Sequence, residues 1–104
     1  MSWTLKITIL AVALVLPLSI ALAGSGNSGC VKWESEAKFV GMAYNHLVHL
    51  ESQCTTTMTC DVSTDVNPKV QTVELAPKAK KTVNTFMGSP ASEFTAKVSC
   101  KANP

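Results

Sequence analysis

Four cysteines constrain the fold of this chain more than any other feature of its sequence. Cys30, Cys54, Cys60 and Cys100 all lie downstream of an apolar N-terminal stretch, in a chain of 104 residues. An even number of cysteines in a small exported chain indicates a disulfide framework, because thiols oxidise outside the cytoplasm. A small domain also gains more from crosslinks, because its core is small relative to its surface. The sequence therefore predicts one small domain in which these cysteines are paired.

The N-terminal stretch has the build of a secretory signal peptide. A short segment with one lysine precedes residues 7–22, which are almost wholly apolar, and small residues end the stretch at Ala23. A membrane anchor is the alternative, but a spanning helix needs roughly 20 apolar residues, slightly more than this stretch offers. A lipid anchor on Cys30 is disfavoured, because Asn27 stands where a leucine is usual. We therefore expect cleavage after Ala23 and a secreted or periplasmic protein with no membrane span.

This reading divides the chain into three parts. Residues 1–23 are the signal peptide. Residues 24–29 (GSGNSG) are expected to be a flexible leader, because they are rich in Gly and Ser. Residues 30–104 are the folded domain.

The charge of the mature chain argues against nucleic acid as a partner. All nine basic residues are lysines, and eight of them remain after cleavage against seven acidic residues, a net charge of +1. A nucleic-acid-binding domain carries a clear basic patch or stripe, which is missing here. The one local cluster, Lys78, Lys80 and Lys81, falls in an expected turn and is interpreted as a solvated hairpin tip.

Period-two alternation predicts strands through the second half of the chain. In residues 58–66, Met58, Cys60, Val62, Thr64 and Val66 alternate with polar residues, so these five side chains are expected to share the buried face. Residues 70–75, 82–87 and 94–100 alternate in the same way. In residues 82–87, Val83, Thr85 and Met87 are expected on one face. Proline- and glycine-containing turns separate these segments at short intervals. Such spacing is typical of a β-sandwich or barrel.

The segment from residue 34 to residue 53 fits two interpretations. A helix would bring its apolar residues near one face, whereas two strands would alternate along residues 31–40 and 44–50. Gly41 weakens a long helix by about 1 kcal/mol relative to alanine. We therefore favour the two strands and expect an all-β fold of five to seven strands.

A resemblance supports this expectation. The stretches TCDVSTDVNP, TVELAPKAKKTVNTF and SEFTAKVSC, in this order after Val48 and Leu50, resemble the small exported immunoglobulin-like β-sandwich proteins of bacteria. The resemblance covers residues 44–100. It implies an immunoglobulin-like sandwich and no particular activity, because this fold serves many functions.

The spacing of the cysteines favours disulfides over metal or redox chemistry. Structural zinc sites pair ligands two to four residues apart, and redox couples use Cys-x-x-Cys, whereas Cys54 and Cys60 are separated by five residues. A hairpin would set these two cysteines opposite each other. We favour the pairs Cys54–Cys60 and Cys30–Cys100, although four cysteines permit three connectivities.

The two histidines are the candidate metal ligands. On a helix, His46 and His49 would lie on one face and could share copper or zinc with a methionine, whereas on a strand they point to opposite faces. We expect a half-buried, hydrogen-bonded His46 and an exposed His49, and thus no cofactor.

No arrangement of nucleophile and base is evident, so we expect a non-enzymatic binding or structural module. Its partner would be a protein or a cell-envelope component. The candidate surface is the threonine-rich segment around residues 55–59. Two alternatives stay open: a copper- or zinc-binding protein that uses His46 and His49, and a small secreted hydrolase inhibitor that presents the loop at residues 88–91.

Overall fold

Seven antiparallel strands in two sheets make up residues 24–104, the part of the chain that this computed structural model describes. The predicted signal peptide, residues 1–23, lies outside the described residues. The strands are β1 (Gly24–Ser28), β2 (Val31–Val40), β3 (Ala43–Ser52), β4 (Met58–Thr64), β5 (Gln71–Leu75), β6 (Lys80–Ser89) and β7 (Ala96–Ala102). Residues 24–104 contain no helix, so the all-β prediction is confirmed.

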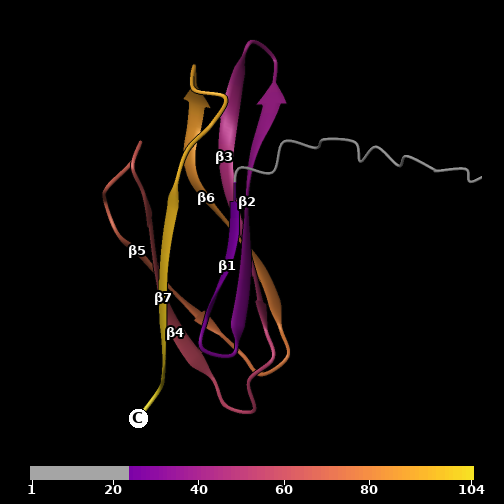
Figure 1. Ribbon diagram of the computed structural model, residues 1–104, viewed down its shortest axis with the longest axis vertical. Helices are drawn as coiled ribbons and strands as arrows, with labels where there is room; N and C mark the ends of the chain where they lie inside the picture. The colour runs from indigo at the N-terminus through magenta and orange to yellow at the C-terminus, as the bar shows by residue number, and fades with distance from the viewer. Residues whose placement is uncertain (1–23) are drawn as a thin grey trace, which may run out of the picture.

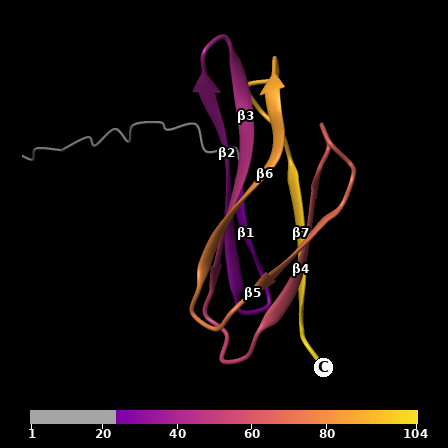
Figure 2. The same cartoon turned by 180° about the vertical axis from the view of Figure 1, so that it is seen from behind.

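The two sheets differ in width. One sheet has four strands in the order β1-β2-β3-β6, and the other has three in the order β5-β4-β7. Figures 1 and 2 show the sheets as two layers, with the β2–β3 hairpin extending past the three-stranded sheet at one end. The two-strand interpretation of residues 34–53 is confirmed, because β2 and β3 pair along their whole length around the turn at Gly41. Within the described part of the chain, no helix is long and apolar enough to cross a membrane.

The prediction of a flexible leader is wrong, because β1 occupies it. Gly24–Ser28 pairs with β2 from Gly24 opposite Ser35 to Ser28 opposite Val31. The two-residue turn between the strands begins with Gly29 at a φ of 60°, a conformation that glycine adopts without strain. Glycine-rich composition is typical of linkers, but β1 forms because β2 offers it a complete partner strand.

The core lies between the sheets and follows the predicted alternation. On β4, Met58, Cys60, Val62 and Thr64 are all buried, as the sequence predicts. Val66, expected on the same face, lies beyond the end of β4 and is only partly buried. The four-stranded sheet contributes every second residue of β3, from His46 to Ser52. The rest of the buried apolar core is Val31, Cys54, Leu75, Val83, Phe94 and Ala96.

One strand breaks the predicted alternation. On β6, Val83 and Thr85 are buried as expected, but Met87 is 70% exposed. Register shifts between β3 and β6 fall on either side of His46. Each shift adds one residue to β6, so the alternation is interrupted over residues 86–88 and Met87 is left outside. The two added residues together restore the original alternation, and Ser89 is buried like Val83 and Thr85.

All four cysteines form disulfides, but the favoured pairing is wrong. Cys30 is bonded to Cys54, and Cys60 is bonded to Cys100. Cys54 cannot face Cys60 across a hairpin, because β3 and β4 belong to different sheets and the segment between them crosses the sandwich. Cys54 instead meets the β1–β2 turn, where the Gln53 N–H donates to the Cys30 carbonyl at 2.8 Å.

The second disulfide joins two neighbouring strands. Cys60 on β4 lies directly opposite Cys100 on β7, with their Cα atoms 4.0 Å apart. The expected Cys30–Cys100 bond is absent, although Cys100 lies close to the β1–β2 turn, where its N–H donates to the Ser28 hydroxyl at 2.9 Å. Two disulfides are consistent with an extracellular or periplasmic location.

Candidate functional site

A trough of about 570 Å³ lies on the outer face of the four-stranded sheet, the face turned away from the three-stranded sheet. Its floor is the backbone of one cross-strand row: Gly26, Trp33, Leu50 and Lys81. The three side chains of this row point to the other face of the sheet. Each strand contributes the residues on either side of this row to the walls. The antiparallel register thus lines up the outward side chains of all four strands in two rows, and these rows are the walls of the trough.

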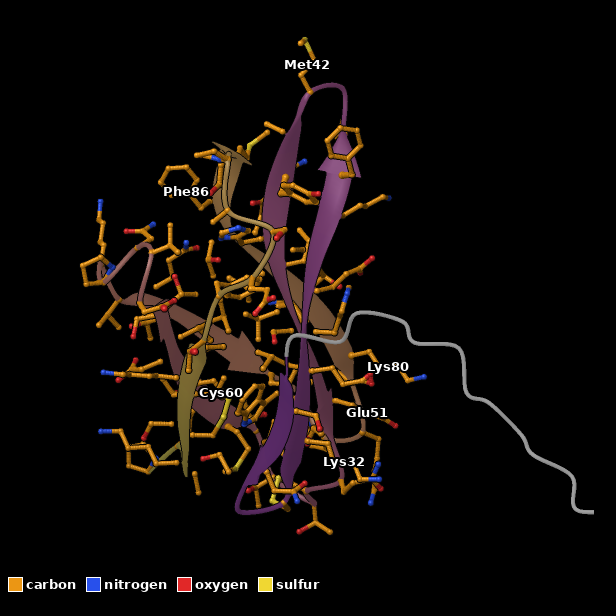
Figure 3. The ribbon with its side chains drawn as sticks, turned by 45° about the horizontal axis from the view of Figure 1, so that its top comes forward. Lys32, Met42, Glu51, Cys60, Lys80 and Phe86 are labelled. Carbon is orange, nitrogen blue, oxygen red and sulfur yellow. A yellow bond between two sulfur atoms is a disulfide. The ribbon has the colours of Figure 1, made fainter. Side chains whose placement is uncertain are left out.

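The first wall is a row of alternating charge. Lys32 on β2 lies opposite Glu51 on β3, and Glu51 lies opposite Lys80 on β6, with Asn27 of β1 at the end of the row. In Figure 3, the labelled Lys32, Glu51 and Lys80 side chains lie close to one another and project from the same side of the ribbon. Opposite charges on neighbouring strands attract modestly. Lys32, Lys80 and Asn27 are exposed, whereas Glu51 is partly exposed and accepts a hydrogen bond from the Gln53 side chain at 3.2 Å.

The second wall contains an ordered histidine. Glu34, His49 and Thr82 form this row with Ser25. The His49 Nε2 lies 2.8 Å from a Glu36 carboxylate oxygen, and its Nδ1 lies 2.8 Å from the Thr82 hydroxyl. Because a carboxylate only accepts, Nε2–H donates to Glu36, and in the neutral ring the Thr82 hydroxyl donates to Nδ1. His49 was expected to be exposed, but the residue is only partly exposed and both of its ring nitrogens are engaged.

His46 is on the opposite face of β3 and does not reach the trough. Its side chain is fully buried, where half-burial was expected, and its ring stacks on Phe94 with centroids 4.2 Å apart. Nε2 donates to the Ala91 carbonyl at 2.8 Å, whereas Nδ1 has no hydrogen-bond partner. The strand alternation of β3 thus keeps His46 and His49 on opposite faces, so the structure does not bring these two candidate metal ligands together.

Residues 24–104 contain no group of three or more His, Cys, Asp or Glu side chains placed to hold a metal ion. The four cysteines are all used in disulfides. The copper or zinc alternative would therefore have to use His49 without a second histidine or a thiolate.

The other surfaces suggested by the sequence lie at the ends of the sandwich. Thr55 and Thr56 are exposed in the segment that crosses between the sheets, whereas the Thr59 hydroxyl donates to the Asn103 side chain. The loop proposed for an inhibitor is fixed from within, because Ala91 accepts a hydrogen bond from His46 and donates one to the Ser89 hydroxyl. These surfaces are separate from the trough.

Exposed apolar side chains mark the far end of the molecule. Met42 lies at the tip of the β2–β3 hairpin (Figure 3), and Phe39 and Val40 beside it are also exposed. Phe39 packs edge-on against Tyr44, with ring centroids 5.1 Å apart.

Sequence reasoning missed the trough because its residues come from four separate segments. The alternation in residues 31–40 and 44–50 does place Lys32, Glu34 and Glu51 on the polar face. Their assembly into rows depends on the register of β1 and β6, which alternation alone does not supply. Lys80 was assigned to a hairpin tip, whereas it begins β6 and stands in the wall.

Comparison of the chain with protein-family models, with curated proteins and with solved structures finds no match. The fold and the site therefore define the class: a disulfide-crosslinked, two-sheet β-sandwich with a polar trough on its wider sheet.

Proposed function

We propose that the chain is a secreted or periplasmic, non-enzymatic binding module that holds a polar segment of a protein partner in the trough. The observation that carries this proposal is the row Lys32–Glu51–Lys80. These charges stand in a concave site of about 570 Å³, within the usual volume range of binding sites. A segment with the opposite order of charges would be complementary to this row, and complementarity of this kind gives specificity.

The sandwich supplies rigidity for such a site. The floor of the trough is β-sheet backbone, and the side chains beneath it, including Leu50, pack into the core. The disulfide between Cys30 and Cys54 fixes the ends of β2 and β3 close to the trough. A preformed site loses little conformational entropy when it binds.

The order of strands supports an immunoglobulin-like assignment. In immunoglobulin domains, strands B and E share one sheet and strands C and F share the other, in the chain order B-C-E-F. Here β3 pairs with β6 and β4 pairs with β7, and the chain visits these strands in the order β3-β4-β6-β7. The resemblance to exported bacterial sandwiches suggested the same fold.

Site-specific crosslinking tests the proposed function. A photo-crosslinking amino acid replaces Thr82 in the wall of the trough, and the protein is irradiated in the envelope and secreted fractions of its own cells. We expect a discrete adduct with one protein, identified by mass spectrometry. The adduct should disappear in the triple variant Lys32→Ala/Glu51→Ala/Lys80→Ala, because this variant removes the charged row and leaves the core intact.

A matched control uses the same crosslinker at Thr72, an exposed position on β5 of the other sheet. An adduct common to both positions would report proximity alone. If Thr82 gives no adduct of its own, or if its adduct persists in the triple variant, the trough is not the binding site.

A further inference from the structure

The outer edge of β7 is a second surface with unused binding capacity. β7 pairs with β4 on one side, and no described strand pairs with it on the other. In Figure 1, β7 lies at the front, with β4 and β5 crossing behind it and β1 of the four-stranded sheet beside it. The three-stranded sheet has one strand fewer than the sheet it faces.

The backbone of this edge is oriented for pairing. The Cys100 N–H donates to the Ser28 hydroxyl, so it points away from β4 and toward the free edge. Cys60 and Cys100 therefore form a non-hydrogen-bonded pair of the β4–β7 ladder, as their short Cα separation of 4.0 Å also indicates. Because backbone direction alternates along a strand, Val98 and Ala102 also present their N–H and C=O groups to the free edge.

The inward side chains beside this edge are incompletely covered. Val98, Cys100 and Trp33 face the core but are only partly buried, whereas the inner residues of β3 are fully covered. On the facing strand β1, Gly24 and Gly26 have no side chains, and the partly exposed Trp33 ring lies against Gly26. Small or apolar side chains of an added strand would cover these residues.

The outer face of β7 is positively charged, which favours an added strand with acidic side chains on the same face. Lys97, Ser99 and Lys101 alternate on this face and are exposed, and neither lysine takes part in an ion pair among the described residues. Antiparallel pairing of two copies centred on Ser99 would set Lys97 of one copy opposite Lys101 of the other. Like charges directly opposite destabilise a pair, and lysines on an edge strand oppose self-association.

We propose that β7 is an acceptor edge for an extended, acidic segment of a partner protein, which adds to the β5-β4-β7 sheet as a fourth strand. Backbone hydrogen bonds to Val98, Cys100 and Ala102 hold the segment. Its inward side chains are small or apolar, and its outward carboxylates lie beside Lys97 and Lys101. The Ser28 hydroxyl occupies the Cys100 N–H in the free protein and is displaced on binding.

The test is an NMR titration of the ¹⁵N-labelled, oxidised protein with a short acetylated peptide that alternates valine and glutamate. We expect millimolar or tighter binding, with shift changes centred on Val98, Cys100 and Ala102 of β7 and on Ser28 of β1. The variant Lys97→Glu/Lys101→Glu should bind about tenfold more weakly, since two attractive charge contacts become repulsive. A peptide with lysine in place of glutamate should likewise bind the parent protein weakly.

Two controls separate strand addition from other binding. The same peptide N-methylated on alternate residues keeps its side chains but loses the donors that face β7, and it should not bind. The variant Lys80→Glu changes the trough and should leave peptide binding unchanged, so this result is independent of the function proposed for the trough. Absence of binding at millimolar peptide, equal binding of the N-methylated peptide, or shifts centred outside β7 and β1 would overturn the proposal.

Discussion

Gly26 is the residue at which β1 depends most directly on its neighbour. A Cβ atom at this position would lie 2.8 Å from Cζ2 of the Trp33 ring, closer than van der Waals contact allows. We predict that Gly26→Ala displaces Trp33 and lowers the free energy of unfolding by about 1–2 kcal/mol, the usual range for overpacking. Urea denaturation measures the loss, and the assigned Trp33 indole N–H resonance reports the displacement.

Gly24→Ala is the matched control, because a Cβ atom there would meet the Ser35 hydroxyl at an ordinary distance of 3.7 Å. Its stability should change by less than about 0.5 kcal/mol, as for most substitutions away from packed features. Equal effects of the two substitutions would contradict the packing of Trp33 over β1.

His46 carries a second prediction at this scale. We predict that His46→Ala lowers the free energy of unfolding by about 3 kcal/mol, because it removes a fully buried ring that stacks on Phe94. His46→Phe restores much of the volume but leaves the Ala91 carbonyl without its donor, so it should cost about 1 kcal/mol. Chemical denaturation of both variants checks the order, and a His46→Ala variant as stable as the parent would exclude the buried position.

Sequence reasoning could orient these side chains but could not supply their partners. Strand alternation on β3 was enough to predict that His46 points inward and His49 outward. The ring that covers His46 belongs to Phe94, which is far along the chain, and this contact depends on how the last loop folds back. Full burial could not be predicted because it requires that loop.

At the scale of elements, β1 shows where composition is misleading. Residues 24–29 have the composition of a linker, yet Gly24–Ser28 is a paired edge strand. We predict that the β1 amides that face β2 exchange with solvent far more slowly than those of a free glycine-rich segment. Hydrogen-exchange NMR on the oxidised protein measures this, and exchange at the free-peptide rate throughout residues 24–28 would restore the leader interpretation.

The two disulfides join different parts of the fold, so the effect of removing each one on stability can be measured separately. Cys60 and Cys100 are 40 positions apart in the sequence, and Cys30 and Cys54 are 24 apart. The loss of chain entropy in the unfolded state gives a stabilisation of about 4 kcal/mol for the first disulfide and about 3.5 kcal/mol for the second. We predict that each double alanine variant loses about 3–4 kcal/mol of unfolding free energy. A loss below about 1 kcal/mol for either variant, measured by urea denaturation, would show that its disulfide contributes little.

Strand positions were largely predictable because alternation is a local property. The segments expected at residues 31–40, 44–50, 58–66, 70–75, 82–87 and 94–100 all correspond to strands of the structure. What alternation does not contain is which strand lies beside which. The segment between Cys54 and Cys60 has a length that suits a hairpin as well as a crossing between sheets, because both place the two cysteines on the buried side. The hairpin interpretation was wrong, and it led to the wrong disulfide pairing.

For the whole molecule, the sheet order determines both proposed sites. The trough requires β1 and β6 to flank the β2–β3 hairpin, and the free edge of β7 requires a three-stranded sheet opposite a four-stranded one. Both features depend on contacts between distant segments. The disulfide pairing depends on the same contacts, because the arrangement of the sheets determines which cysteines lie close enough to bond.

Mapping the disulfides therefore tests the account most directly. Trypsin and cyanogen bromide together place each cysteine in its own peptide, because lysines or methionines separate all four, with Met58 between Cys54 and Cys60. Under non-reducing conditions, the account predicts that the peptide containing Cys30 is linked to residues 43–58, and that residues 59–69 are linked to residues 98–101. A link between residues 43–58 and 59–69, or recovery of free thiols from the natively produced protein, would contradict it.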